Sequence, residues 1–191
     1  MCLILASASP RRQELLKLFG IPFIVRVAAI DETMDPAASA YDEVARLSRE
    51  KALAVTREAG DIVIAADTIV VCEGRVLGKP HSEEEAFAML SLLSGRDHQV
   101  MTGCTVLLGE RAETFTEVTD LHFRELSEKE IRRYVASGEP MDKAGAYGIQ
   151  GGAALFCEKM DGDYYNVMGL PVCRLGETLK ELAPELMGEL L

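Results

Sequence analysis

The chain has 191 residues, of which 48% are hydrophobic, and 31 acidic against 20 basic side chains give it a net charge of −11. A chain of this length buries about 70% of its unfolded surface, so its core needs neither a disulfide nor a metal to be stable. The acidic excess repels phosphate backbones and excludes a general nucleic-acid binder. No stretch approaches the ~20 apolar residues of a membrane span, so we expect a soluble, cytoplasmic protein that does not contact a membrane.

The basic residues are concentrated at the start of the chain. Residues 1–30 carry four basic groups and one acid, a local net of +3, which leaves −14 on the rest. The basic end could still bind a small polyanion. The five cysteines are scattered without a C-x-x-C pair, and the three histidines form no metal-binding motif. This pattern favours reduced thiols over disulfides or a zinc site.

Strands and helices alternate from the N-terminus. The apolar run Leu3–Ala6 predicts a short buried strand. Ser9 followed by Pro10 predicts the start of a helix, because serine caps the free N–H groups and proline fits the first helical position. Gly20 is expected to end this helix, and a second strand is expected over Phe23–Ala28.

Three later helices are predicted from a serine followed three residues on by a carboxylate, which is the capping-box pattern. The pairs are Ser39 with Asp42, Ser82 with Glu85, and Ser127 with Glu130. Glycines just beyond the periodic residues predict where these helices end, at Gly60, Gly95 and Gly138.

Strand signals lie between the helices. The run 61–66 predicts a buried strand, 70–72 with 75–77 a hairpin, and 100–108 with 111–123 a longer antiparallel pair. In the glycine-rich segment 140–171 we expect no clear helix, a strand over 153–159, and a last helix from Pro171. The absence of a linker favours a single α/β domain over residues 1–191, made of two lobes.

The segment from Ser7 to Arg12 lies at the predicted turn from strand to helix. Backbone N–H groups and the helix dipole favour an anion there, and the hydroxyls of Ser7 and Ser9 add donors. Arg11 and Arg12 can grip phosphate oxygens, but adjacent helical residues point ~100° apart, so one of them is expected to face the anion. The alternative is a helix cap followed by two solvated arginines.

Asp67 closes the apolar run 62–66, which places a carboxylate at the predicted end of a strand. Strand ends that open onto a cleft are common ligand sites in α/β folds, so this residue is a candidate base or metal ligand. The alternative is a capping aspartate in a turn.

Other charged residues are more typical of solvated surfaces when each is taken alone. Together they supply cations for phosphates and carboxylates for a metal and a water, as phosphoryl transfer requires. The set comprises Arg11, Asp31, Glu32, Lys51, Asp67 and Lys79.

Gln150 is the amide side chain of the glycine-dense segment 147–152. A glutamine offers one donor and one acceptor, which match the N3–H and the adjacent carbonyl of uracil or thymine. Alternatively, the glycines only shape a tight loop.

Taken in chain order, eight segments of this sequence resemble the Maf family of nucleotide pyrophosphatases. The resemblance covers essentially the whole chain. The segments are LASASPRR (5–12), IDE (30–32), EKA (50–52), AADTIVV (65–71), GKP (78–80), LSGRDHQVMTG (93–103), GEPMDKAGAYGIQG (138–151) and DYYNVMGLP (163–171).

The resemblance implies an enzyme that clears the nucleotide pool by hydrolysing a nucleoside triphosphate between its α and β phosphates. It implies a long mixed sheet with flanking helices in two lobes around a cleft, similar to inosine triphosphatases. It also implies a divalent cation, Mg²⁺ or Mn²⁺, and a homodimer, although no residue here indicates a dimer.

The resemblance also assigns residues to the site. Asp67 falls on the catalytic position, where it would activate the attacking water and share the metal with Glu32. Substrate-binding positions fall on Ser7, Arg11, Lys51 and Lys79. Three specificity positions, Arg12, Thr68 and Gln150, match the subfamily that hydrolyses dTTP and UTP.

Two alternatives stay open at this point. The same hydrolysis could act on 7-methyl-GTP, CTP or a modified pyrimidine triphosphate. The family is named for a link to septum formation, so a nucleotide-binding regulator of cell division is the alternative from another class. The complete set of cations and carboxylates favours catalysis, because a pure binder needs no acid beside its anion site.

Overall fold

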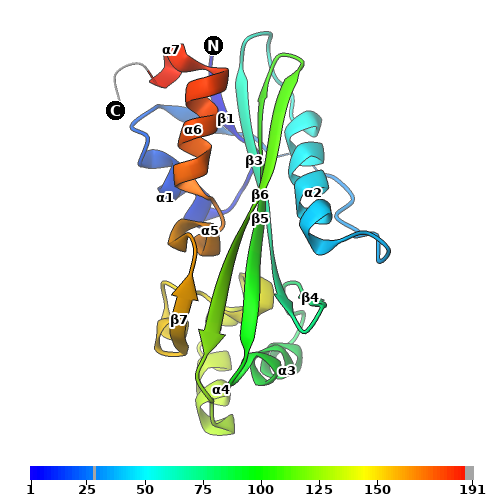
Figure 1. Cartoon of the computed structure of the whole chain (residues 1–191), viewed down its shortest axis with the longest axis vertical. Helices are drawn as coiled ribbons and strands as arrows, with labels where there is room; N and C mark the ends of the chain where they lie inside the picture. The colour runs from blue at the N-terminus through cyan, green and yellow to red at the C-terminus, as the bar shows by residue number, and fades with distance from the viewer. Residues whose placement is uncertain (28, 188–191) are drawn as a thin grey trace. The chain divides into compact units, whose positions relative to one another are not determined.

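A computed structural model describes residues 1–27 and 29–187 (Figure 1). Within these residues, seven strands form a sheet in the order β2-β1-β3-β5-β6-β7, with β4 paired to β3. The strands are β1 (Leu3–Leu5), β2 (Phe23–Val25), β3 (Ile62–Cys72), β4 (Arg75–Leu77), β5 (Asp97–Leu108), β6 (Arg111–Phe123) and β7 (Cys157–Asp161). The sheet is mixed, since β1 runs parallel to β2 and β3 while β3–β4 and β6–β7 are antiparallel.

Helices connect and cover these strands. They are α1 (Pro10–Lys17), α2 (Ala40–Ala54), α3 (Glu83–Leu93), α4 (Glu128–Val135), α5 (Tyr164–Met168), α6 (Val172–Leu182) and α7 (Pro184–Met187). Three short 3-10 helices are η1 (Glu139–Asp142), η2 (Ala144–Ala146) and η3 (Gly152–Leu155). In the part of the chain that is described, no helix has the length and apolar character that crossing a membrane requires.

The chain divides into two compact units. The first unit is Met1–Asp67, Thr102–Glu117 and Gly169–Leu191; the second is Thr68–Met101 and Val118–Met168. The long strands β3, β5 and β6 contribute residues to both. That the two units form one domain around a cleft stays a prediction.

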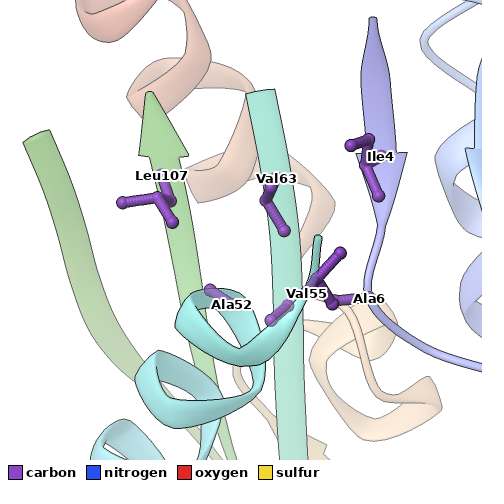
Figure 2. Packing of buried hydrophobic residues seen from close by; sticks show 7 residues of the cluster. Ile4, Ala6, Ala52, Val55, Val63 and Leu107 are labelled. Atoms are coloured by element: carbon purple, nitrogen blue, oxygen red, sulfur yellow. The ribbon is translucent and has the colours of Figure 1, made fainter. Parts of the chain in front are cut away.

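The first unit is organised by the period-two alternation of its strands. Alternate residues along β1 and β3 pack with Leu107 of β5 against Ala52 of helix α2 and against Val55, which follows that helix (Figure 2). The members of this cluster are Ile4, Ala6, Ala52, Val55, Val63, Ala65 and Leu107. The alternation therefore determines which face of β3 packs against α2.

Glycine lets helix α2 lie close to the sheet at Gly103. A Cβ placed at Gly103 on β5 would collide with the backbone of Val44 on α2. On the other side of the strands lie α1 and α6 (Figure 1). There Gly176 of α6 faces Phe19, and a Cβ at Gly176 would be 3.4 Å from the phenyl ring.

The second unit contains a cluster of aromatic side chains that pack edge to face. The rings of His98, Phe123 and Tyr147 meet edge to face, with Phe123 4.7 Å from His98 and 4.8 Å from Tyr147 between centroids. Phe156 continues the cluster to Tyr134 of α4 at 5.2 Å. Such edge-to-face contacts stabilise the fold beyond what the burial of apolar surface contributes.

Several predicted boundaries are confirmed. Ser9 caps α1, and the hairpin β3–β4 and the neighbouring strands β5 and β6 lie where the sequence predicts them. All three predicted serines accept a hydrogen bond from the backbone N–H three residues on. Of the three pairs, only Ser127 with Glu130 completes the reciprocal capping box. Glu85 instead accepts from the N–H of His81, and Asp42 accepts from the hydroxyl of Ser39.

Other boundaries are wrong. Helix α2 ends at Ala54, well before Gly60, because Val55 becomes extended and buries its side chain in the core cluster. Residues 153–155 belong to η3, so the predicted strand over 153–159 begins only at Cys157. The strand predicted over 23–28 ends at Val25, and its last residue, Ala28, lies outside the described residues.

Candidate functional site

The turn from β1 into α1 has the composition of an anion site. Ser9 Oγ accepts from the N–H of Arg12 at 3.5 Å, and Ser7 Oγ accepts from the N–H of Ser9 at 3.2 Å. The first turn of α1 carries no carboxylate, so its positive end is not neutralised by its own helix. Ser7 is only 7% exposed, which fixes its hydroxyl beside the helix start.

Arg12 is held by the protein itself. Its Nε donates to the carbonyl of Gly169 at 2.7 Å, and its Nη1 donates to Ser7 Oγ at 3.2 Å. Burial lowers the pKa of Arg12, while the carboxylates of Asp67 and Glu32 act to raise it. Those two carboxylates therefore lie within electrostatic range of the helix start.

Asp67 lies in the middle of β3, not at a strand end as the sequence predicts. The strand continues because β-branched residues follow it. Residues two apart share a face, so Asp67 lies on the same face as Val63 and Ala65, toward α2. The capping aspartate of a turn, the alternative interpretation, is likewise wrong.

Lys51 joins two of the predicted carboxylates. It lies one residue before the core residue Ala52 on α2, and its Nζ is 2.5 Å from Asp67 Oδ1 and 3.0 Å from Glu32 Oε1. Lys51 and Asp67 are 15% and 13% exposed, whereas Glu32 is 61% exposed. The two carboxylate oxygens are therefore no more than 5.5 Å apart, the sum of the two distances.

Helix α2 also holds the loop that carries Glu32. Arg46 Nη2 donates to the carbonyl of Thr33 at 2.9 Å, and Glu43 Oε2 accepts from the N–H of Asp35 at 2.8 Å. The guanidinium of Arg46 hydrogen-bonds to Glu43 and lowers its pKa to about 2. Sequence reasoning missed both residues, and the only signal was their i, i+3 spacing on a helix.

The Glu32–Asp67 pair has the chemistry of a partial metal site. Among residues 1–27 and 29–187, no three His, Cys, Asp or Glu side chains gather to hold an ion. Mg²⁺ is usually bound by one or two carboxylates together with substrate phosphates and water. Two carboxylates already sharing one cationic partner fit that requirement.

The remaining predicted residues belong to the second unit. Lys79 is exposed on the loop after β4, where the carbonyl of Gly78 accepts from the N–H of Gly145 at 3.0 Å. Gln150 is exposed at a corner of a turn closed by the N–H of Gly151 donating to the carbonyl of Gly148 at 3.0 Å. Thr68 follows Asp67 on β3.

The predicted residues thus fall into two groups. The structure brings Lys51 into contact with Asp67 and Glu32, and Arg12 into contact with Ser7. These five and Arg11 belong to the first unit, and Thr68, Lys79 and Gln150 belong to the second.

Comparison with known proteins decides the family. The sequence model described as "Maf-like protein" matches residues 2–182. The chain belongs to this family.

Curated Maf relatives match along nearly the whole chain. A dTTP/UTP pyrophosphatase of Bacillus cereus (strain B4264) is 51% identical over 180 residues, which is 94% of each chain. The dTTP/UTP pyrophosphatase of Bacillus thuringiensis subsp. konkukian (strain 97-27) is also 51% identical, with the same coverage.

A solved structure confirms the fold class. A HAM1 protein from Coxiella burnetii superposes with a TM-score of 0.51 and 16% identity, covering 95% of this chain and all of that one. At this identity the likeness bears on the fold alone. The mixed α/β architecture with a seven-stranded sheet and flanking helices agrees with the prediction for a Maf-like chain.

Proposed function

We propose that this Maf-family chain is a pyrophosphatase that hydrolyses dTTP and UTP to the nucleoside monophosphate and pyrophosphate. Relatives at 51% identity carry the name dTTP/UTP pyrophosphatase. The observation that carries the proposal is the contact of Lys51 with both Asp67 and Glu32, within electrostatic range of the N-terminus of α1, whose first turn carries no carboxylate. Sites of phosphoryl transfer combine cations that bind the phosphates with carboxylates that hold a metal and a water. Free nucleoside triphosphates as substrates suit the cytoplasm.

In this proposal the triphosphate is bound by hydrogen-bond donors and by cations. The N–H groups at the start of α1 and the hydroxyl of Ser7 bind one phosphate, and Arg11, Lys51 and Lys79 supply positive charge. These groups offset the repulsion that a triphosphate meets from a chain of net charge −11. A divalent cation held by Glu32 and Asp67 would neutralise charge on the phosphate oxygens.

Asp67 is the proposed base. It takes a proton from a water that attacks the α-phosphate, and pyrophosphate leaves as the α–β bond breaks. Its position suits this role, because β3 fixes the backbone and Lys51 fixes the carboxylate. When Asp67 turns to the water, Lys51 is released from that contact and can bind phosphate instead.

Gln150, Thr68 and Arg12 are the proposed specificity residues. The amide of Gln150 pairs with the N3–H and the adjacent carbonyl of uracil or thymine. Cytosine carries no N3–H, so an amide oriented for uracil finds no donor at N3. Such a mismatch discriminates strongly between the two bases when the contact is buried. Arg12 fixes Ser7 and the Gly169 loop around the start of α1.

A nucleotide panel tests the proposal. The purified protein is incubated with dTTP, UTP, CTP, ATP and 7-methyl-GTP in Mg²⁺ and in Mn²⁺, and pyrophosphate and orthophosphate are measured separately. We expect pyrophosphate with dTTP and UTP as the preferred substrates. Orthophosphate as the product would contradict α–β cleavage, and nucleotide binding without turnover in either metal would favour the regulator of cell division.

A further inference from the structure

Glu139 has both of its carboxylate oxygens engaged inside the second unit. Oε1 accepts a hydrogen bond from the hydroxyl of Tyr134 at 2.8 Å, and Oε2 accepts from the N–H of Gly152 at 3.0 Å. The family resemblance gives Glu139 no role, although it lies within a matching segment. A half-buried carboxylate that receives two hydrogen bonds is held in one orientation.

Tyr134 extends this network to the other side of the Gln150 turn. Its hydroxyl oxygen accepts from the N–H of Gly148 at 3.0 Å while its proton goes to Glu139. Gly148 and Gly152 flank the turn that presents Gln150. Tyr134 and Glu139 therefore grip both ends of that turn, and we call the two side chains the Tyr134–Glu139 clamp.

Burial keeps the clamp in place. Tyr134 is 7% exposed and packs edge to face on Phe156. Burial raises the pKa of the Tyr134 phenol, so the hydroxyl remains a donor throughout the physiological range. The position of the hydroxyl is thus fixed by the aromatic cluster, independently of the loop.

One glycine of the turn, Gly151, lies directly against the clamp. A Cβ on Gly151 would collide with the carboxylate of Glu139, and one on Gly148 would lie 2.7 Å from Cε of Lys143. Gly148 and Gly151 do not have positive φ angles, so the backbone conformation does not require glycine at either. Gly151 lets the turn lie directly on the carboxylate of Glu139, which two hydrogen bonds hold in place, whereas the flexible end of Lys143 could move away from a Cβ on Gly148.

We propose that Glu139 and Tyr134 are positioning residues for base selection, holding the turn so that the Gln150 amide meets the pyrimidine edge. The inference rests on the proposed function, since it assumes that Gln150 reads the base. A single glutamine amide distinguishes uracil from cytosine only if its donor and acceptor are fixed. Freeing either end of the turn lets the amide rotate and shift, which weakens the discrimination without touching the phosphates.

The test compares kcat/KM for UTP and for CTP in Glu139→Gln and Tyr134→Phe. Glutamine has one acceptor where glutamate has two, and phenylalanine removes the hydroxyl that Gly148 contacts. We expect the UTP/CTP ratio to fall about tenfold, the value of one hydrogen bond, with CTP hydrolysis unchanged within about twofold. Glu158→Gln and Tyr165→Phe, exposed residues of the same unit, are the matched controls and should keep the ratio.

A double-mutant cycle separates positioning from general damage. If the clamp acts through Gln150, Glu139→Gln has no further effect on the ratio in a Gln150→Ala background. Gly151→Ala displaces the turn with the clamp residues intact and should lower the ratio equally. An unchanged ratio in Glu139→Gln and Tyr134→Phe, or a full additional loss in the Gln150→Ala background, would overturn the proposal.

Amide hydrogen exchange gives a readout that needs no activity. We expect faster exchange at Gly148 in Tyr134→Phe and at Gly152 in Glu139→Gln, with the rest of the second unit unchanged. If the wild type hydrolyses no nucleotide, the proposed function fails while this exchange still reports the clamp. Slow exchange at both amides in the variants, or unfolding seen as loss of protection throughout the unit, would overturn the assignment of a local positioning role.

Discussion

Replacing Lys51 with methionine probes the contact on which the site depends. In the free protein, the ammonium of Lys51 occupies the position between Asp67 and Glu32 where a divalent cation would bind. A metal ion must displace it to reach both carboxylates. Lys51→Met removes this competitor while methionine keeps the length of the apolar side chain, so we expect free Mn²⁺ to bind more tightly to the variant.

The geometry sets the magnitude. Two negative charges at most 5.5 Å apart repel by at least about 3 kcal/mol at an effective dielectric constant of ~20. Because Glu32 is 61% exposed, solvent screens part of this repulsion, and we take about half as available to a replacing cation. That half corresponds to Mn²⁺ binding about tenfold tighter.

The assay is calorimetric titration of Mn²⁺ at low salt without nucleotide, alongside UTP hydrolysis. Lys129→Met, an exposed lysine on α4, is the control and should change neither quantity. We expect Lys51→Met to bind Mn²⁺ more tightly and yet to hydrolyse UTP at least tenfold more slowly, since a phosphate contact is lost. Equal or weaker Mn²⁺ binding would refute Glu32 and Asp67 as the metal pair.

Three further predictions test other parts of the account. Burial lowers the pKa of His98 from 6.5 to about 4, so the stability that its neutral ring contributes is fully present above pH 6.5 and is lost as the pH falls toward 4. The free energy of unfolding measured with urea should fall by on the order of 2 kcal/mol between pH 7.5 and pH 5, and His98→Gln should remove this fall. Gly103→Ala should cost about 1–3 kcal/mol of unfolding free energy because its Cβ meets the Val44 backbone, whereas Gly78→Ala, whose Cβ meets nothing, should stay within about 0.5 kcal/mol. Gln150→Glu should lower kcat/KM for UTP at least tenfold, because it removes the amide donor. It should leave the melting temperature unchanged, because Gln150 is exposed on a turn. An unchanged kcat/KM would mean that Gln150 only shapes its loop.

Local signals explain what the sequence could predict. A serine cap or a two-residue turn acts over three or four positions, so the start of α1 and the hairpin β3–β4 were predicted correctly. The Maf motifs likewise identified Lys51, Asp67 and Glu32, which the fold brings together although they are far apart in the chain.

Tertiary packing decided what the sequence could not predict. A polar residue after an apolar run looks like a strand end, but β3 continues through Asp67, whose carboxylate accepts a hydrogen bond from Lys51 of helix α2. The sequence does not single out Glu43 or Glu139, because their roles depend on partners supplied by the loop 31–35 and by Tyr134. Such contacts leave no periodic trace in a sequence.

The most direct test of the central claim is the kcat of Asp67→Asn for UTP, with pyrophosphate release as the readout. Asp120→Asn, an aspartate on β6 that accepts a hydrogen bond from Gln99, is the matched control. If Asp67 is the base, the variant loses at least 100-fold in kcat, the lower end of the usual contribution of a general base, while its near-ultraviolet circular dichroism and the activity of the control remain as in the wild type. A folded Asp67→Asn that keeps more than about a tenth of the wild-type kcat would contradict the account.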